Sequence, residues 1–248
     1  MNVAVAALSL APGLALGSFL NVVAARVPLR RSIVSPGSAC LSCGGRITWY
    51  DNVPVVSWLL LRGRCRSCGA GIPWVYPAVE LTTALLVAGC ILAFGVTLDA
   101  LVAAFFCAVL VVVSATDLAH RIIPNRVVVP AAAVVLVAQT LLHPSPEWAL
   151  GALGAAGFLL VAAIAYPGGM GMGDVKLALL MGAMLGRNVA VALMLGMVLA
   201  LVPSVALLVR HGSAARKMGI PFGPFLALGS VLALFWGGRV LDGYLGLL

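Results

Sequence analysis

The sequence predicts an all-α, polytopic membrane protein with about eight transmembrane helices and one large loop between the first two. Three observations support this fold class. Of the 248 residues, 63% are hydrophobic and only 9% are charged, whereas soluble domains carry about 25% charged residues. Apolar runs long enough to cross a bilayer recur along the chain. The one long polar interruption, residues 26–73, holds seven of the 15 Lys and Arg residues.

This composition excludes several classes of protein. The mean hydropathy is +1.16, and a soluble fold of this size cannot hide so much apolar surface from water. An ordinary cytosolic enzyme, a disordered chain and a small disulfide-rich secreted domain are therefore excluded. The net charge of +8 raises the possibility of nucleic acid, but the sequence lacks the interleaved aromatic and basic stripe that stacks on bases. We expect membrane lipid as the surroundings and no nucleic-acid partner.

The apolar runs predict the individual spans. We expect them near residues 3–25, 74–95, 100–116, 127–143, 148–166, 175–186, 189–209 and 223–241. The first run has its positive charges after it rather than before it, so we expect a retained helix and not a signal peptide. The sixth run is too short for a full crossing unless it extends over Gly173 and Asp174 or lies deep in the bundle.

The basic residues predict the orientation. With the N-terminus outside and the loop 26–73 inside, all but two of the 15 Lys and Arg residues, Arg187 and Arg239, fall on the cytoplasmic side. Cytoplasmic loops of membrane proteins carry this excess of positive charge. The opposite orientation reverses the distribution and is rejected.

Four cysteines in the loop predict a metal site. Cys40 and Cys43 form one Cys-x-x-Cys pair, which Gly44 follows directly. Cys65 and Cys68 form the second pair, which Gly69 follows directly. Two such pairs at this spacing are typical of a zinc ribbon, in which four thiolates hold a structural Zn²⁺. Two disulfides conflict with a reducing cytoplasm. Thiols with a redox role or with no role remain the alternatives.

Two acids near membrane depth are candidate functional residues. Asp117 ends the third span and Asp174 begins the sixth, so both are expected at the cytoplasmic face. A charge at the bilayer centre costs about 2.5–3.5 kcal/mol on insertion scales, which makes an intramembrane acid a functional hypothesis. Two adjacent carboxyls cannot both ionise, and a pair that shares one proton can activate water and polarise a peptide carbonyl. Unhindered backbone for an extended substrate is expected at the nearby glycines, Gly168, Gly169, Gly171 and Gly173.

Other interpretations of these acids remain open. Asp117 could be an interfacial acid offset by Arg121, and Asp174 could be a helix N-cap. Lys176 is expected to reach the headgroups rather than to catalyse. A proton-coupled transporter could use Asp117 and Asp174 as a relay, although no internal repeat of the kind found in transporters is visible. A membrane scaffold whose cysteine loop recruits a partner is a third possibility.

Taken in order, these motifs resemble a known family, the bacterial type IV prepilin leader peptidases, which also methylate the new N-terminus. The resemblance begins at residues 17–28, continues through 36–40, both cysteine pairs, 49–66 and 76–80, and covers nearly the whole chain. In the second half it includes Asp117 with residues 123–125, Gly171-Met172-Gly173-Asp174 and residues 221–225. The Gly-x-Gly-Asp element is also similar to that of presenilin-type intramembrane aspartyl proteases.

The resemblance implies an activity and a division of the chain. Asp117 and Asp174 would be the catalytic pair, supported by Gly171 and Gly173. The substrates would be prepilins and pseudopilins, cut after a short basic leader at the cytoplasmic face of the bacterial inner membrane. S-adenosylmethionine would then methylate the new N-terminal residue. Residues 1–99 would form the methyltransferase part. Glu80 in this part would bind the substrate, although it could equally be an interfacial anchor. Residues 100–248 would form the peptidase domain.

Overall fold

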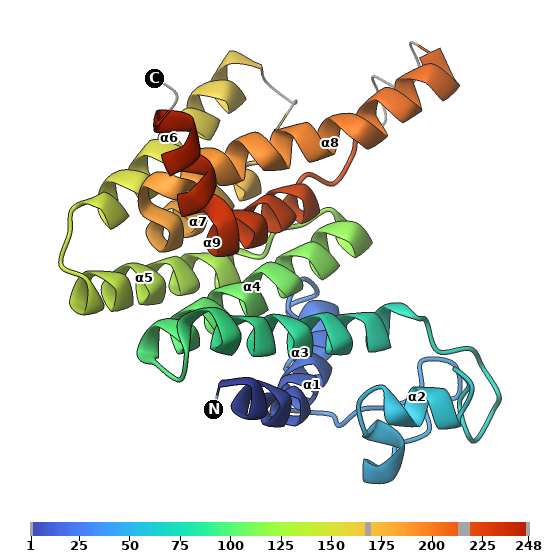
Figure 1. Cartoon of the computed structure of the whole chain (residues 1–248). Helices are drawn as coiled ribbons and strands as arrows, with labels where there is room; N and C mark the ends of the chain where they lie inside the picture. Colours follow the sequence, from blue (N-terminus) through green and yellow to red (C-terminus); the bar gives the residue numbers. More distant parts are fainter. Residues whose placement is uncertain (1, 167–169, 213–218, 247–248) are drawn as a thin grey trace. The chain divides into compact units, whose positions relative to one another are not determined.

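The computed structural model describes residues 2–166, 170–212 and 219–246. Within these residues the regular elements are helices, and the only β-structure consists of two isolated bridges. The chain divides into two compact units, Met1–Ala115 and Thr116–Leu248. Figure 1 shows the elements in sequence colours, from blue at the N-terminus to red at the C-terminus.

The first unit contains a closely packed helix pair, α1 (Asn2–Arg26) and α3 (Val75–Phe94). Two glycines one turn apart on α1 allow the approach. A Cβ at Gly13 would lie 2.7 Å from the Ala84 Cα, and one at Gly17 would lie 2.5 Å from the Glu80 Cα. Small residues at this spacing let helices in membranes pack backbone to backbone. The pair therefore fixes the position of Glu80 on α3.

The loop between α1 and α3 carries two short helices, η1 (Trp49–Asn52) and α2 (Val56–Leu60). Each cysteine pair forms a tight turn closed by a bridge, Ala39 with Arg46 and Arg64 with Gly71. The next helix along the chain, α4 (Leu98–His120), begins in the first unit and ends in the second.

The second unit is a bundle of helices arranged around α7. After the end of α4 it contains α5 (Asn125–Leu142), α6 (Glu147–Ala165), α7 (Met172–Leu185), η2 (Gly186–Asn188), α8 (Val189–His211) and α9 (Gly223–Leu245). Helix α7 contacts α5, α6, α8 and α9. Gly151 of α6 and Gly182 of α7 touch through their backbones. The protein therefore surrounds α7 on several sides.

The short sixth run is explained by this central position. Helix α7 begins at Met172, three residues before the run predicted from hydropathy, and so it includes Gly173 and Asp174 as the longer alternative required. Its 14 residues span about 21 Å at 1.5 Å per residue, less than the ~30 Å of a hydrocarbon core. Every residue from Leu180 to Leu185 is buried. Helix α7 is thus short because neighbouring helices, rather than lipid, cover it.

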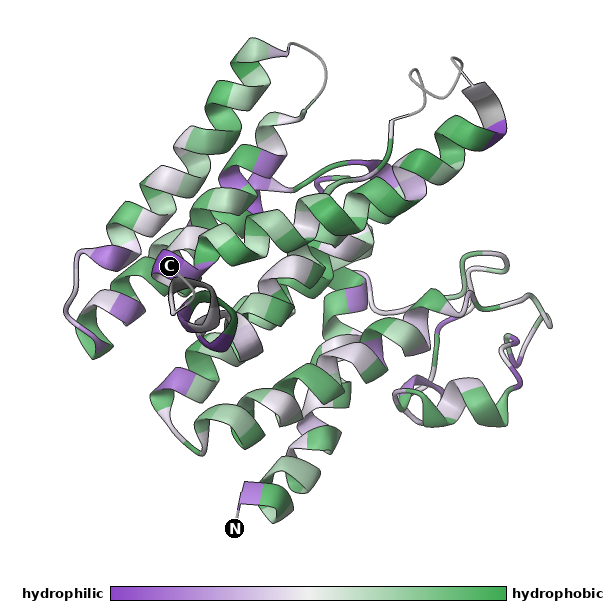
Figure 2. Ribbon diagram, turned by 45° about the horizontal axis from the view of Figure 1, so that its top comes forward, coloured by the Kyte–Doolittle hydropathy of each residue, from purple (hydrophilic) through white to green (hydrophobic). Residues whose placement is uncertain are grey.

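The predicted all-α membrane fold is confirmed. Each of the eight predicted spans corresponds to one helix of the structure, α1 and α3 to α9. Seven stretches in the described residues are long and apolar enough to cross a membrane, and one of these, Met172–Arg210, combines α7, η2 and α8. Figure 2 shows apolar residues along most of the helices, with hydrophilic residues gathered toward helix ends and connecting segments.

Candidate active site and metal centre

Asp117 lies in the last turn of α4 and is only 6% exposed. Helix α4 ends three residues later, at His120, because Arg121 adopts a left-handed φ of 54° and its N–H closes the final turn on the Asp117 carbonyl oxygen at 2.9 Å. The Asp117 carboxylate Oδ2 accepts a hydrogen bond of 2.9 Å from the backbone N–H of Gly223, the first residue of α9. A helix N-terminus carries partial positive charge, so the start of α9 stabilises negative charge on Asp117.

Asp174 occupies the third position of α7 and is 8% exposed. Its Oδ2 accepts a hydrogen bond of 3.2 Å from the backbone N–H of Gly171. Gly171, not Asp174, is the N-cap residue, so the simple N-cap interpretation of Asp174 is wrong. The carboxylate folds back on the helix start as the acid of a capping box does. Each of the two acids is therefore held by a glycine N–H at the beginning of a helix.

Both carboxyls line one cavity of 1060 Å³ within the second unit. Arg121, Lys176 and Asn125 also line it, and the Lys176 Nζ donates a hydrogen bond of 3.0 Å to the Asn125 Oδ1. Asp117 reaches this cavity from α4 and Asp174 reaches it from α7. A cavity of this size has room for an extended peptide segment and water beside the carboxyls.

The predicted supporting glycines have different surroundings. A Cβ at Gly173 would lie 2.8 Å from the Ile123 Cβ, so only glycine lets α7 pack against the segment that follows α4. A Cβ at Gly171 would meet its nearest atom, the Asp174 Oδ2, at 3.4 Å, which is an ordinary contact. Gly168 and Gly169 lie outside the described residues.

The four cysteines of the loop come together as the spacing predicts. Their Sγ atoms lie within 4.8 Å of one another, and the Cys40 and Cys68 sulfurs are 3.8 Å apart. In a tetrahedral site with Zn–S bonds of about 2.3 Å, sulfurs are separated by about 3.8 Å. Gly44 and Gly69 have the left-handed φ values, 68° and 71°, that the turns require. The cluster can therefore hold a zinc ion.

Local hydrogen bonds prepare this cluster for a cation. The backbone N–H groups of Cys43 and Ser42 lower the pKa of the Cys40 thiol to about 6. A thiolate, not a thiol, is the metal ligand, so this lowering of the pKa favours metal binding by Cys40. The donor set of four sulfurs is that of a structural zinc site.

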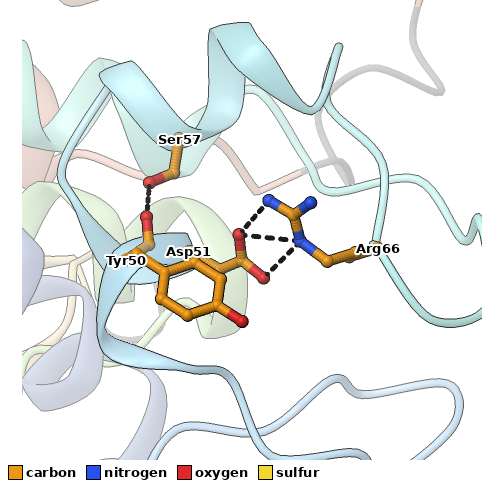
Figure 3. Close-up of polar contacts among 4 residues, drawn as sticks. All are labelled: Tyr50, Asp51, Ser57 and Arg66. Carbon is orange, nitrogen blue, oxygen red and sulfur yellow. Dashed lines mark hydrogen bonds and ion pairs between the residues drawn. The ribbon is translucent and has the colours of Figure 1, made fainter.

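An ion pair joins the second cysteine turn to η1 (Figure 3). The Arg66 guanidinium binds Asp51 through two nitrogens, with its NH2 2.6 Å from Oδ1 and its Nε 2.9 Å from Oδ2. Arg66 also lies over the Tyr50 ring, and the Ser57 hydroxyl donates to the Tyr50 carbonyl oxygen at 2.8 Å. This pairing holds the pKa of Asp51 below its ordinary value. The turn around Cys65 and Cys68 is thereby connected through η1 to α2.

Glu80, the predicted substrate-binding residue, lies on α3 in the first unit and not in the aspartate cavity. Its side chain is buried, and its Oε2 accepts a hydrogen bond of 2.7 Å from the Val55 N–H. Val55 precedes α2. Glu80 thus faces the cysteine loop.

Sequence reasoning missed the role of Gly223. It belongs to residues 221–225, which are part of the resemblance to the family, but nothing near it in sequence points to Asp117. One local signal was available. A Gly-Pro pair before an apolar run marks a helix start, and helix starts offer free N–H groups to acids. The ion pair between Asp51 and Arg66 had no comparable signal.

Comparison with known proteins identifies the family of the chain. Residues 12–94 match the bacterial peptidase A24 N-terminal domain, and residues 104–205 match the type IV leader peptidase family. A prepilin leader peptidase/N-methyltransferase of Bacillus subtilis is 39% identical over 94% of this chain and 95% of its own length. A protein of the same name from Pseudomonas aeruginosa is 34% identical over 94% of this chain and 91% of its own length. Another from Xanthomonas campestris is 32% identical over 94% of this chain and 92% of its own length.

No solved structure matches the chain. The family matches nevertheless cover both units, and the relatives align along nearly the entire sequence. The resemblance seen in the motifs is confirmed. The chain belongs to the type IV leader peptidase family.

Proposed function

We propose that this protein is an intramembrane aspartyl peptidase that removes the leader of type IV prepilins and pseudopilins and then N-methylates the new terminus. One observation carries the peptidase assignment. Asp117 and Asp174, each held by a glycine N–H, line the same cavity in a chain of the type IV leader peptidase family.

The proposed hydrolysis uses the two carboxyls as a pair. Because like charges close together cannot both ionise, Asp117 and Asp174 hold one proton between them. The ionised carboxyl takes a proton from water, and the protonated carboxyl donates a hydrogen bond to the scissile carbonyl oxygen. The bonds from Gly223 and Gly171 fix one oxygen of each carboxyl and leave the other oxygen for water and substrate. Gly171 and Gly173 support this arrangement at the start of α7.

The N-terminal part of the chain is proposed to carry the methyltransferase, in residues 1–99, with 100–248 as the peptidase domain. S-adenosylmethionine supplies the methyl group, and Glu80 binds the substrate terminus. Zinc held by Cys40, Cys43, Cys65 and Cys68 stabilises the loop. The names of the relatives, which join both activities, support this assignment.

The protein is a multi-pass membrane protein, and we propose the bacterial inner membrane as its location. The N-terminus lies outside, and the cysteine loop and both aspartates lie at the cytoplasmic face. The distribution of basic residues supports this orientation.

Cleavage of a co-expressed prepilin tests the proposed function. Asp117→Asn and Asp174→Asn should each abolish leader removal while the protein still inserts into the membrane. Asp242→Asn, a change at an exposed acid of α9, is the matched control and should cleave normally. Full cleavage in either site variant would remove the peptidase assignment and leave the proton relay as the better explanation.

A further inference from the structure

Helix α2 presents an apolar face that residues 2–115 leave uncovered. Its side chains Val56, Leu59 and Leu60 are 49%, 61% and 78% exposed. Residues three and four positions apart lie on one side of a helix, so these three side chains form a single surface, the α2 face. A helix on the surface of a soluble protein turns its apolar side toward the core. The opposite arrangement in α2 points to a partner that covers the face.

Contacts on the other side of α2 fix it in this orientation. The Ser57 hydroxyl donates to the Tyr50 carbonyl oxygen, and Figure 3 shows Ser57 pointing from α2 toward this oxygen. The Trp58 Nε1 donates to the Ile72 carbonyl oxygen at 3.0 Å, and Gly63 lies directly against the Trp58 ring. The residues that form hydrogen bonds therefore face the loop, and the aliphatic residues face outward.

A hydrogen bond to α3 sets the depth of α2. The N–H of Val55, directly before α2, donates to the Glu80 Oε2 at 2.7 Å. Glu80 lies five residues into α3, a helix long and apolar enough to cross a membrane. At 1.5 Å per residue this is about 8 Å along the helix from its first residue. Interfacial helices bury their apolar face about 5–10 Å into the boundary between headgroups and acyl chains. The start of α2 therefore lies at the level of the interface.

The residues beside α2 are of the kind found at membrane interfaces. Trp74, the residue before α3, is 70% exposed, and tryptophan is enriched where membrane meets water. Arg62 and Arg64 follow α2, are exposed and form no ion pair with any acid in the described part of the chain. Arginine side chains extend over apolar surface to reach headgroup phosphates. The same two cations disfavour a basic protein partner.

We propose that the α2 face docks on the membrane itself. Val56, Leu59 and Leu60 lie among the acyl chains at the interface, and Arg62 and Arg64 bind headgroup phosphates. In the proposed orientation this surface belongs to the cytoplasmic leaflet. The cysteine loop is then held against the bilayer at α2, in addition to its attachments to α1 and α3, and does not stand free in the cytoplasm.

A fluorescent amino acid in place of Leu60 tests this contact in the full-length protein in lipid nanodiscs. The probe should lose most of its fluorescence when the lipid is phosphatidylcholine with brominated acyl chains. It should lose little when iodide, which stays in water, is added. The same probe in place of Ser67, an exposed polar residue of the second cysteine turn, is the control and should show the opposite pattern.

Two acidic substitutions test whether the apolar side chains make the contact. With the probe in place of Val56, Leu59→Asp/Leu60→Asp should abolish quenching by brominated lipid, because a carboxylate resists transfer from water into acyl chains. Leu41→Asp, at a leucine of the first cysteine turn that is 90% exposed, is the matched control and should leave the quenching unchanged. Hydrogen exchange at the amides of Cys40 and Gly44, which are bonded within that turn, should be unchanged in the double variant and shows that the loop remains folded.

Three results would overturn the proposal. Quenching at Leu60 by iodide alone would place the α2 face in water. Quenching by neither agent would show that protein covers the face, either another part of this chain or a second copy. Retained lipid quenching in Leu59→Asp/Leu60→Asp would show that the apolar side chains do not make the contact. Because both leaflets carry brominated lipid, an inverted topology would not change the expected result, and its failure is distinguishable from failure of the docking.

Discussion

The backbone N–H of Gly223 donates a hydrogen bond of 2.9 Å to the Oδ2 of Asp117, although 106 positions separate the two residues. The contact brings the start of α9 against the end of α4. It places a helix N-terminus, with its partial positive charge, beside a buried carboxyl. Asp174 has the equivalent arrangement within α7, where Gly171 is the donor.

Gly223→Ala should impair cleavage. A Cβ at this position would lie 2.9 Å from the Asp117 Oδ2, so either the carboxyl or the start of α9 must move. A displacement of about 1 Å in a catalytic group can cost about 100-fold in rate. We expect kcat to fall by about that factor, with KM near the wild-type value, in a cleavage assay with purified protein.

The control for this change is Gly238→Ala, further along α9, where a Cβ meets no atom within 4 Å. It should cleave at the wild-type rate. Equal activity of Gly223→Ala and Gly238→Ala would show that the Gly223 contact does not position Asp117.

Gly173→Ala should lower stability more than Gly171→Ala. The new Cβ would lie 2.8 Å from the Ile123 Cβ, whereas the Cβ at position 171 has at least 3.4 Å of space. Overpacking of this kind costs about 1–3 kcal/mol. Thermal unfolding in nanodiscs should therefore give a clearly lower midpoint for Gly173→Ala, and similar midpoints for the two variants would contradict the described packing.

Zinc should be present at one ion per chain in protein purified without chelators. A Cys40→Ser/Cys43→Ser double variant should lose it, because two of four thiolate ligands are removed. Elemental analysis by mass spectrometry measures the content. Cys90→Ser/Cys107→Ser is the matched control, since these buried cysteines of α3 and α4 lie outside the cluster, and it should keep its zinc. Zinc-free wild-type protein would favour thiols without a metal.

The orientation can be tested by labelling single introduced cysteines with a membrane-impermeant maleimide. Leu41→Cys, at a position 90% exposed in the cysteine loop, should react only after the cells are permeabilised. Val96→Cys, 68% exposed between α3 and α4, should react in intact cells. The reverse pattern would invert the proposed topology.

Hydropathy predicted most of the helices, and cysteine spacing predicted the four residues of the cysteine cluster. Lipid demands apolar runs of a fixed length, so the helices could be located from composition alone. Cysteine pairs at the spacing of a metal site predicted four sulfurs around one point, as the structure has them. The start of α7 was placed three residues late because Met172, Gly173 and Asp174 belong to a capped first turn that hydropathy does not register.

Contacts between distant segments were not predictable in the same way. The hydrogen bond from Gly223 to Asp117 depends on how α9 packs against α4, and no local pattern encodes that approach. The ion pair between Asp51 and Arg66 depends likewise on the folding of the whole loop. Hydropathy also cannot distinguish a helix facing lipid from one buried in protein, so it does not explain why α7 is shorter than a full crossing.

The central claim is that Asp117 and Asp174 act as one catalytic unit, and a double-mutant cycle tests it most directly. Cleavage rates of purified Asp117→Asn, Asp174→Asn and the double variant should be equally low, because residues that act together are strongly non-additive. A double variant much slower than either single variant, or a single variant that retains the wild-type rate, would contradict the paired mechanism.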